Sequence, residues 1–192
     1  LSLSFLFSAQ VLSADCADAS GTTVTISTSC TDLNISGDSS NVTINSGVTI
    51  DEIGGGNSTA VSLENSTDTT ITNNGTISSV GNNSSAGHWA LRNYITSTIT
   101  NLSNNGTISA VGNSSIKNAG TITTLTNIGT ISATKEIGLY NTGDGLIGTL
   151  TNSGTISAGD GYDFGLKNYG TIETLINSGT ISAEDDNGLW SD

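Results

Sequence analysis

A five-residue phrase, Asn-x-Gly-Thr-Ile, occurs seven times in this 192-residue chain, and its spacing is the strongest constraint on the fold. Four of the copies are separated by 23, 25 and 25 residues, and they open at Asn104, Asn127, Asn152 and Asn177. A second series of apolar residues interleaves with them at similar steps, namely Leu91, Ile116, Leu139, Leu166 and Leu189. A period near 25 residues that persists over most of a chain is typical of a solenoid, in which each repeat packs only on its neighbours.

Apolar and polar residues alternate within each repeat, as they do in short strands. In the unit that begins at Leu166 we expect Leu166, Ile172 and Ile181 to point inward and their neighbours outward, because side chains alternate along a strand. Asn and Gly interrupt the alternation, and both favour turns. The sequence therefore predicts an all-β protein, a parallel β-helix (β-solenoid) with about 25 residues and three short strands per coil.

Stacking such coils places like residues on like. The predicted inward ladders are Ile99, Ile122, Ile147 and Ile172; Leu102, Leu125, Leu150 and Leu175; and Ile108, Ile131, Ile156 and Ile181. Aligned Asn side chains are expected to hydrogen-bond along the stack. The Gly two places after each Asn is expected to supply a positive backbone angle at a tight corner. Leu63 is expected to extend the Leu91 series by one longer step. A leucine-rich repeat is disfavoured because its Leu-x-x-Leu-x-Leu framework is not visible.

Charge limits the partners that this chain can bind. The formal net charge is −13, and the only cationic side chains other than His are Arg92, Lys117, Lys135 and Lys167. Nucleic-acid affinity rests on Lys and Arg that neutralise phosphates, so a nucleic-acid partner is not expected. An anionic membrane surface is disfavoured for the same reason.

The chain divides into three expected regions. Residues 1–14 are apolar and end in small residues, which indicates a partial signal peptide. Residues 15–50 are expected to form an N-terminal cap or the first coils, and they contain Cys16 and Cys30, which are predicted to form a disulfide in an oxidising compartment. Residues 51–192 are the β-helix repeats, which we expect to be truncated at the C-terminus.

Few residues suggest chemistry. The loops that follow the Ser-Ala pairs vary, and two of them bring five carboxylates to one expected edge: Asp160, Asp163, Glu184, Asp185 and Asp186. Such a cluster is most simply a solvated acidic loop, although carboxylates also bind Ca²⁺ or act as the acid pair of a glycosidase. We keep Ca²⁺ as an alternative and expect no other metal or cofactor. His88 is interpreted as a loop residue beside Trp89, not as a ligand or a base, because no second His lies nearby.

The repeated phrases carry a resemblance to a known family. An apolar leader, a short Cys-containing lead and the segments Asn152–Ala158 and Asn177–Ala183 resemble the N-terminal passenger region of a bacterial autotransporter. The resemblance implies a right-handed parallel β-helix, secreted or displayed at the cell surface through the outer membrane of a Gram-negative bacterium. It also implies a C-terminal translocator β-barrel in the full-length protein. None of the family's catalytic motifs matches a residue of this chain.

These patterns predict a structural stalk or adhesin that binds a host-cell or surface ligand and has no intrinsic catalysis. The acidic edge is the first expected contact, and outer aromatic residues could contact glycans, namely Trp89, Tyr94, Tyr169 and Trp190. One alternative is a polysaccharide-active β-helix enzyme. A second alternative is an ice- or crystal-binding solenoid, suggested by an outward row of Thr107, Thr130, Thr155 and Thr180.

Overall fold

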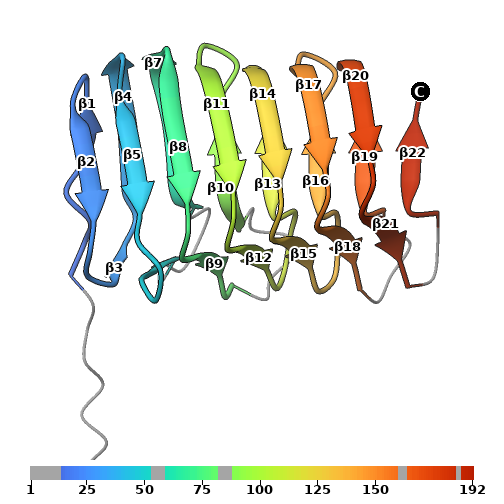
Figure 1. Ribbon diagram of the computed structural model, residues 1–192, viewed down its shortest axis with the longest axis horizontal. Coiled ribbons are helices and arrows are strands. Elements are labelled where there is room, and N and C mark those ends of the chain that lie inside the picture. The colour runs from blue at the N-terminus through green and yellow to red at the C-terminus, as the bar shows by residue number, and fades with distance from the viewer. Residues whose placement is uncertain (1–13, 53–58, 82–87, 160–163, 185–186) are drawn as a thin grey trace, which may run out of the picture.

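The chain folds as a right-handed parallel β-helix made only of strands and turns in the part that the computed structural model describes (Figure 1). That part comprises residues 14–52, 59–81, 88–159, 164–184 and 187–192. The predicted fold class is therefore confirmed. All but the last residue of the predicted signal peptide, 1–14, lie outside the described residues.

Three sheets run along the solenoid, and each takes one strand from each coil. The first sheet contains β1 (Ala19–Ser20), β4 (Leu33–Asp38), β7 (Thr59–Thr67), β10 (Trp89–Asn93), β13 (Ile116–Asn118), β16 (Leu139–Asn141), β19 (Leu166–Asn168) and β22 (Leu189–Ser191). The second contains β2 (Thr23–Ile26), β5 (Asn41–Ile44), β8 (Thr69–Asn73), β11 (Thr98–Asn104), β14 (Thr121–Asn127), β17 (Leu146–Asn152) and β20 (Thr171–Asn177). The third contains β3 (Cys30–Thr31), β6 (Thr49–Glu52), β9 (Thr76–Ser79), β12 (Thr107–Ala110), β15 (Thr130–Ala133), β18 (Thr155–Ala158) and β21 (Thr180–Ala183).

The core is a set of apolar ladders, and the three predicted ones have the predicted register. Ile99 pairs with Ile122, Leu102 with Leu125 and Ile108 with Ile131, and the pairing continues residue for residue through β17, β18, β20 and β21. Their members in the inner coils are almost completely buried, whereas Ile172, Leu175 and Ile181 in the last full coil are more exposed because no coil covers their far side.

One predicted alignment is wrong. Leu91 pairs with Val61 in β7, not with Leu63, and Leu63 pairs with Asn93 instead. The step between β7 and β10 is therefore 30 residues. Leu63 fills the corner position that Asn occupies in the later coils of this sheet. It lies two residues after the ladder position, and its apolar side chain made it resemble a ladder residue in the sequence.

Asn side chains line two corners and hydrogen-bond from coil to coil, as predicted, and all of them are buried except Asn177 in the last full coil. One ladder ends its strands in the second sheet, with Asn–Asn distances of 2.7–2.8 Å through Asn73, Asn104, Asn127, Asn152 and Asn177. The other ends its strands in the first sheet, at 2.8 Å through Asn93, Asn118, Asn141 and Asn168. Each ladder Asn in the inner coils also donates to a main-chain carbonyl of the next coil, for example Asn127 to Thr155 O at 3.0 Å.

The predicted reason for the corner glycines is wrong. None of them has a positive φ, since the positive-φ glycines of the described chain are Gly21, Gly37 and Gly47. A Cβ on Gly129 would instead lie 2.0 Å from the carbonyl oxygen of Gly106 in the preceding coil, and one on Gly154 would lie 2.0 Å from Gly129 O. Glycine is required here because stacked corners bring two backbones into contact.

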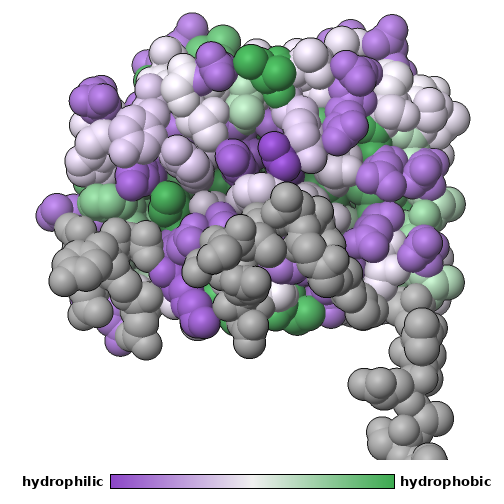
Figure 2. Space-filling model, turned by 180° about the vertical axis from the view of Figure 1, so that it is seen from behind, coloured by the Kyte–Doolittle hydropathy of each residue, from purple (hydrophilic) through white to green (hydrophobic). Residues whose placement is uncertain are grey.

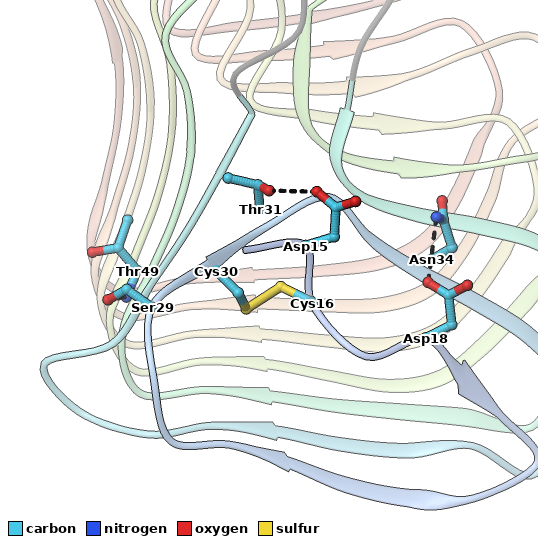
Figure 3. The surroundings of a disulfide bond; sticks show 8 residues. All are labelled: Asp15, Cys16, Asp18, Ser29, Cys30, Thr31, Asn34 and Thr49. Atoms are coloured by element: carbon cyan, nitrogen blue, oxygen red, sulfur yellow. Dashed lines mark hydrogen bonds between the residues drawn. A yellow bond between two sulfur atoms is a disulfide. The ribbon is translucent and has the colours of Figure 1, made fainter. Parts of the chain in front are cut away.

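The predicted disulfide between Cys16 and Cys30 is present in the N-terminal coil (Figure 3). Their Cα atoms are 5.0 Å apart, and Cys30 pairs with Ile50 across the third sheet. Polar side chains surround the bond: Thr31 Oγ1 donates to Asp15 Oδ1 at 2.9 Å, and the main-chain N–H of Thr49 donates to Ser29 Oγ at 3.0 Å. Strands β1 to β6 thus belong to the same three sheets as the repeats, as shorter coils.

Candidate functional site

Of the five carboxylates at the predicted acidic edge, one lies within the described residues. Glu184 follows β21 and is exposed, whereas Asp160, Asp163, Asp185 and Asp186 lie outside the described residues. Within the described ranges, no group of three or more His, Cys, Asp or Glu side chains is arranged to hold a metal ion. Calcium binding at this edge therefore stays a prediction.

A different surface concentrates the unusual side chains of this chain. On the outer side of the first sheet, one position is in register from coil to coil, and from β10 onward its occupants are Arg92, Lys117, Tyr140, Lys167 and Trp190. They point outward because they alternate with the buried ladder residues on either side, such as Ile116 and Asn118 around Lys117. Figure 2 views the molecule from behind, the side on which this sheet lies. Neighbouring positions are about 4.8 Å apart along the axis.

The N-terminal half of this row is built around Trp89. The guanidinium carbon of Arg92 lies 4.4 Å from the centre of the Trp89 ring and 3.9 Å from that of Tyr94. The ammonium nitrogen of Lys117, one coil later, lies 4.7 Å from the Trp89 ring. Trp89 is itself buried, so two cations cover a ring that the solenoid already shields. These are cation–π distances.

The C-terminal half is built around Lys167. Its ammonium nitrogen lies 5.1 Å from the Phe164 ring, 5.3 Å from that of Tyr169 and 5.8 Å from that of Trp190. The rings also touch one another edge to face: Tyr169 is 4.7 Å from Trp190 and 6.0 Å from Tyr140. Tyr169 is 43% exposed, which makes it the most open ring of the group. We call the whole set the cation–aromatic face: Trp89, Arg92, Tyr94, Lys117, Tyr140, Phe164, Lys167, Tyr169 and Trp190.

This concentration is unusual for so acidic a chain. Three of the four Lys and Arg residues in the sequence lie on this face. All six aromatic side chains that the structure describes also lie there. Isolated surface aromatics are ordinary, whereas this group is contiguous and rimmed by charge.

Burial and mutual repulsion affect the titration of the face. The pKa of Lys117 is lowered, first by burial and then by the positive charge of Arg92, while Glu136 opposes the shift. Burial raises the pKa of Tyr94, and Glu64 adds to the increase through its charge and a hydrogen bond, against the effect of Arg92. The pKa of Tyr140 is raised by burial and by Tyr169. Both tyrosines therefore remain neutral hydroxyl donors at physiological pH.

Sequence reasoning named Trp89, Tyr94, Tyr169 and Trp190 as outer aromatics but did not bring them together with the cations. The signal was present, because the variable position of the phrase Leu/Ile-x-Asn reads Arg92, Lys117, Tyr140 and Lys167 in successive units. Because the cations were interpreted as scattered residues, the row that they share with Tyr140 was not predicted.

A second cluster is internal and was also missed. Glu52 ends β6, Ser79 ends β9, and the two are partners across the third sheet at the inward position that Ala takes in later coils. His88 Nδ1 lies 3.0 Å from Glu52 Oε2, and Ser79 Oγ donates to the same oxygen at 3.1 Å. Glu52 is 0% exposed and His88 is 4% exposed. His88 is therefore the buried partner of a core carboxylate, and not merely a loop residue beside Trp89.

The Thr row proposed from the sequence is in register. Thr107, Thr130, Thr155 and Thr180 pair in turn along the third sheet, and all point outward. A second outward array, not predicted, lies on the second sheet. It has two polar columns, which comprise Thr70, Asn101, Thr124 and Thr149, and Thr72, Ser103, Thr126 and Thr151.

The described part of the chain contains no helix that could cross a membrane. The cation–aromatic face offers positive charge, hydroxyl donors and ring surfaces along one line, which suits binding of an extended ligand. The internal cluster offers an acid and an imidazole without access from solvent. Comparison with known proteins adds no assignment: no family model, no curated protein and no solved structure matches this chain.

Proposed function

We propose that this chain is a non-catalytic binding stalk of a secreted or surface-displayed protein, an adhesin of the autotransporter passenger type, which binds glycans through its cation–aromatic face. One observation carries the proposal: the described aromatic side chains and three of the four Lys and Arg residues converge on one outer sheet of an acidic solenoid. Aromatic rings pack against the C–H faces of sugars, while the cations and tyrosine hydroxyls pair with their polar groups.

The repeat architecture supports a binding role over catalysis. A stack of coils presents the same outer position every 4.8 Å or so, which suits a long ligand held by many weak contacts. The outer position of the Leu/Ile-x-Asn phrase differs from coil to coil, while the ladders on either side of it stay nearly constant. Repeat proteins usually carry recognition at variable outward positions of a constant scaffold.

The test is binding of the purified chain to an array of immobilised polysaccharides. Tyr169→Ala removes the most exposed ring of the face, and it should weaken binding about 5- to 100-fold if the ring is a central contact. Ile128→Ala is the matched control, because Ile128 also follows a ladder Asn and is 59% exposed, but it lies at a different corner. Equal binding by both variants would remove the face from the proposal. Turnover of a polysaccharide would favour the alternative of a polysaccharide-active enzyme.

A second candidate, an ice- or crystal-binding solenoid, is favoured by the two polar columns on the second sheet. Their rows are about 4.8 Å apart and the columns about 6.6 Å apart, so Thr and Ser hydroxyls, with one Asn amide, form a repeating polar array. Thr124→Lys places a charge inside this array, between Asn101 and Thr149. If the array recognises a crystal, the wild-type chain should inhibit ice recrystallisation and the variant should not. No inhibition by the wild-type chain contradicts this candidate.

A further inference from the structure

We infer that the ligand of the cation–aromatic face is an acidic polysaccharide, such as a uronate polymer, lying along the solenoid axis. This inference rests on the proposed function and names its ligand class. It is carried by the order of residues along the first sheet, in which two cations in adjacent coils, Arg92 and Lys117, are followed in register by Tyr140, Lys167 and Trp190.

The charges on the face suit a partner that supplies negative charge. Arg92 and Lys117 occupy adjacent coils and repel each other, and this repulsion is one reason that the pKa of Lys117 is lowered. Glu136 acts on Lys117 and Glu64 acts on Tyr94, so the described carboxylates offset part of this repulsion. A carboxylate brought in by a ligand would relieve the repulsion between the two cations, as opposite charges within a few ångströms favour both charged forms.

The geometry suits a linear polymer better than a single sugar. Lys117 and Lys167 are two coils apart, about 10 Å along the axis, with Tyr140 between them. A polysaccharide that lies parallel to the axis would contact Lys117, Tyr140, Lys167 and Trp190 in turn, that is, a cation, a ring, a cation and a ring. Each contact is weak alone, but the contacts on one chain act together and raise the overall affinity.

The aromatic rings favour a uronate over the simplest alternative for a cationic face, a small inorganic anion. Lys167 is surrounded by Phe164, Tyr169 and Trp190 at 5.1–5.8 Å, and Tyr169 remains open to solvent. An anion would use the ammonium group alone, whereas a uronate has both a carboxylate and an apolar C–H face. Single-stranded nucleic acid also combines charge with stacking surfaces. The net charge of −13 repels both kinds of polyanion, so a direct comparison of their affinities is what separates them.

The experiment compares polygalacturonate with its methyl ester, which has the same backbone without the charge. The wild-type chain should bind the acidic polymer, bind the ester at least fivefold more weakly, and lose affinity as salt screens the contacts. Monomeric galacturonate should bind far more weakly than the polymer. Lys117→Gln and Lys167→Gln should each weaken binding about two- to fivefold, the range of an exposed ion pair. Lys135→Gln is the matched control, because Lys135 follows β15 outside the face.

The possible outcomes separate this inference from the proposed function. If the chain binds polygalacturonate and its methyl ester equally and independently of salt, and Tyr169→Ala abolishes this binding, the inference of an acidic ligand is overturned. The proposed binding of glycans by this face then stands. Binding that Lys135→Gln weakens as much as Lys167→Gln overturns the assignment to this face. Absence of binding to every polysaccharide overturns the proposed function as well. Tighter binding of a single-stranded oligonucleotide than of polygalacturonate also overturns the inference. Unchanged thermal melts of the variants show that the fold is retained in each comparison.

Discussion

At the scale of single residues, the corner asparagines illustrate how one side chain holds two coils together. Asn127 accepts a hydrogen bond from Asn104 Nδ2 at 2.8 Å and donates to Asn152 Oδ1 at 2.7 Å and to Thr155 O at 3.0 Å. All of these groups are buried or half-buried, so water cannot easily take the place of a hydrogen-bond partner that a substitution removes. The ladder therefore satisfies main-chain groups that the turn would otherwise leave unpaired.

Asn127→Ala should lower the free energy of unfolding by about 2–4 kcal/mol, because it leaves buried donors and acceptors of two neighbouring coils without partners. Asn105→Ala is the control variant, since Asn105 donates to Asn74 Oδ1 at 2.9 Å in an exposed Asn–Asn pair. Chemical denaturation of the two variants measures the loss of stability in each. If the two variants lose the same stability, the buried ladder contributes no more than a surface hydrogen bond.

Asp32 shows the opposite case, a residue that costs stability. Its pKa is raised above 3.8 by burial first, and then by the negative charges of Glu52, Asp15 and Asp51. The folded chain therefore holds this proton more tightly than the unfolded chain does. The charged carboxylate destabilises the fold at every pH above the folded pKa, and the penalty disappears below the unfolded value.

Asp32→Asn should raise the melting temperature at pH 7, because it removes the repelled charge. Asn also tolerates the left-handed backbone that Asp32 adopts, with φ of 48°. The gain should shrink as the pH falls toward 3.8 and vanish below it, where Asp32 itself is neutral. Melts over this pH range measure the effect, and a gain that persists at low pH contradicts the electrostatic cause.

At the scale of strands and coils, the sequence predicted the interior better than the exterior. Ile and Leu recur at fixed offsets within each unit, so the inward ladders and the parallel pairing followed from spacing alone. The row of Arg92, Lys117, Tyr140 and Lys167 has the same spacing, but its residue type changes at every step. The Glu52–His88 contact crosses between coils of unequal length, so no spacing in the sequence relates the two residues.

Substitution of a corner glycine tests whether close stacking of coils, and not the backbone angle, requires glycine at the corner. Gly129→Ala should destabilise the chain by about 1–3 kcal/mol or more, because its Cβ would overlap Gly106 O in the preceding coil. Gly143→Ala should have little effect, since nothing lies within 4 Å of a Cβ there. Denaturant melts compare the two. Similar losses would indicate that conformational freedom, and not contact between coils, is what glycine provides.

The buried pair of Glu52 and His88 links the end of β6 to the start of β10. His88→Ala should cost about 3–5 kcal/mol, because it removes the imidazole from a completely buried carboxylate and leaves it the Ser79 hydroxyl. The double variant Glu52→Ala with His88→Ala should be more stable than His88→Ala alone, since later coils carry Ala at the position of Glu52. Chemical denaturation separates the two outcomes. A double variant less stable than the single one would mean that Glu52 contributes mainly through packing.

At the scale of the whole molecule, the described strands pair from one coil to the next and not across the stack. Each strand pairs only with its counterparts one coil before and one coil after, so a perturbation has no direct route to the far end. The disulfide lies in the N-terminal coil, and it closes a separation of 14 residues between Cys16 and Cys30. Its stabilising effect should therefore be local, in contrast to its effect in a globular domain with one shared core.

Replacing Cys16 and Cys30 with Ser should remove about 2–4 kcal/mol from the N-terminal coils, the typical contribution of such a cross-link. Hydrogen exchange should accelerate in β1 to β6 and stay unchanged in β13 to β18, because the repeats between them remain intact. The native chain with the disulfide oxidised is the reference, and its reduction by dithiothreitol should reproduce the pattern of the double variant. Faster exchange spread evenly over all the coils would show that the solenoid unfolds as one cooperative unit, and the N-terminal disulfide would then stabilise the cation–aromatic face as well.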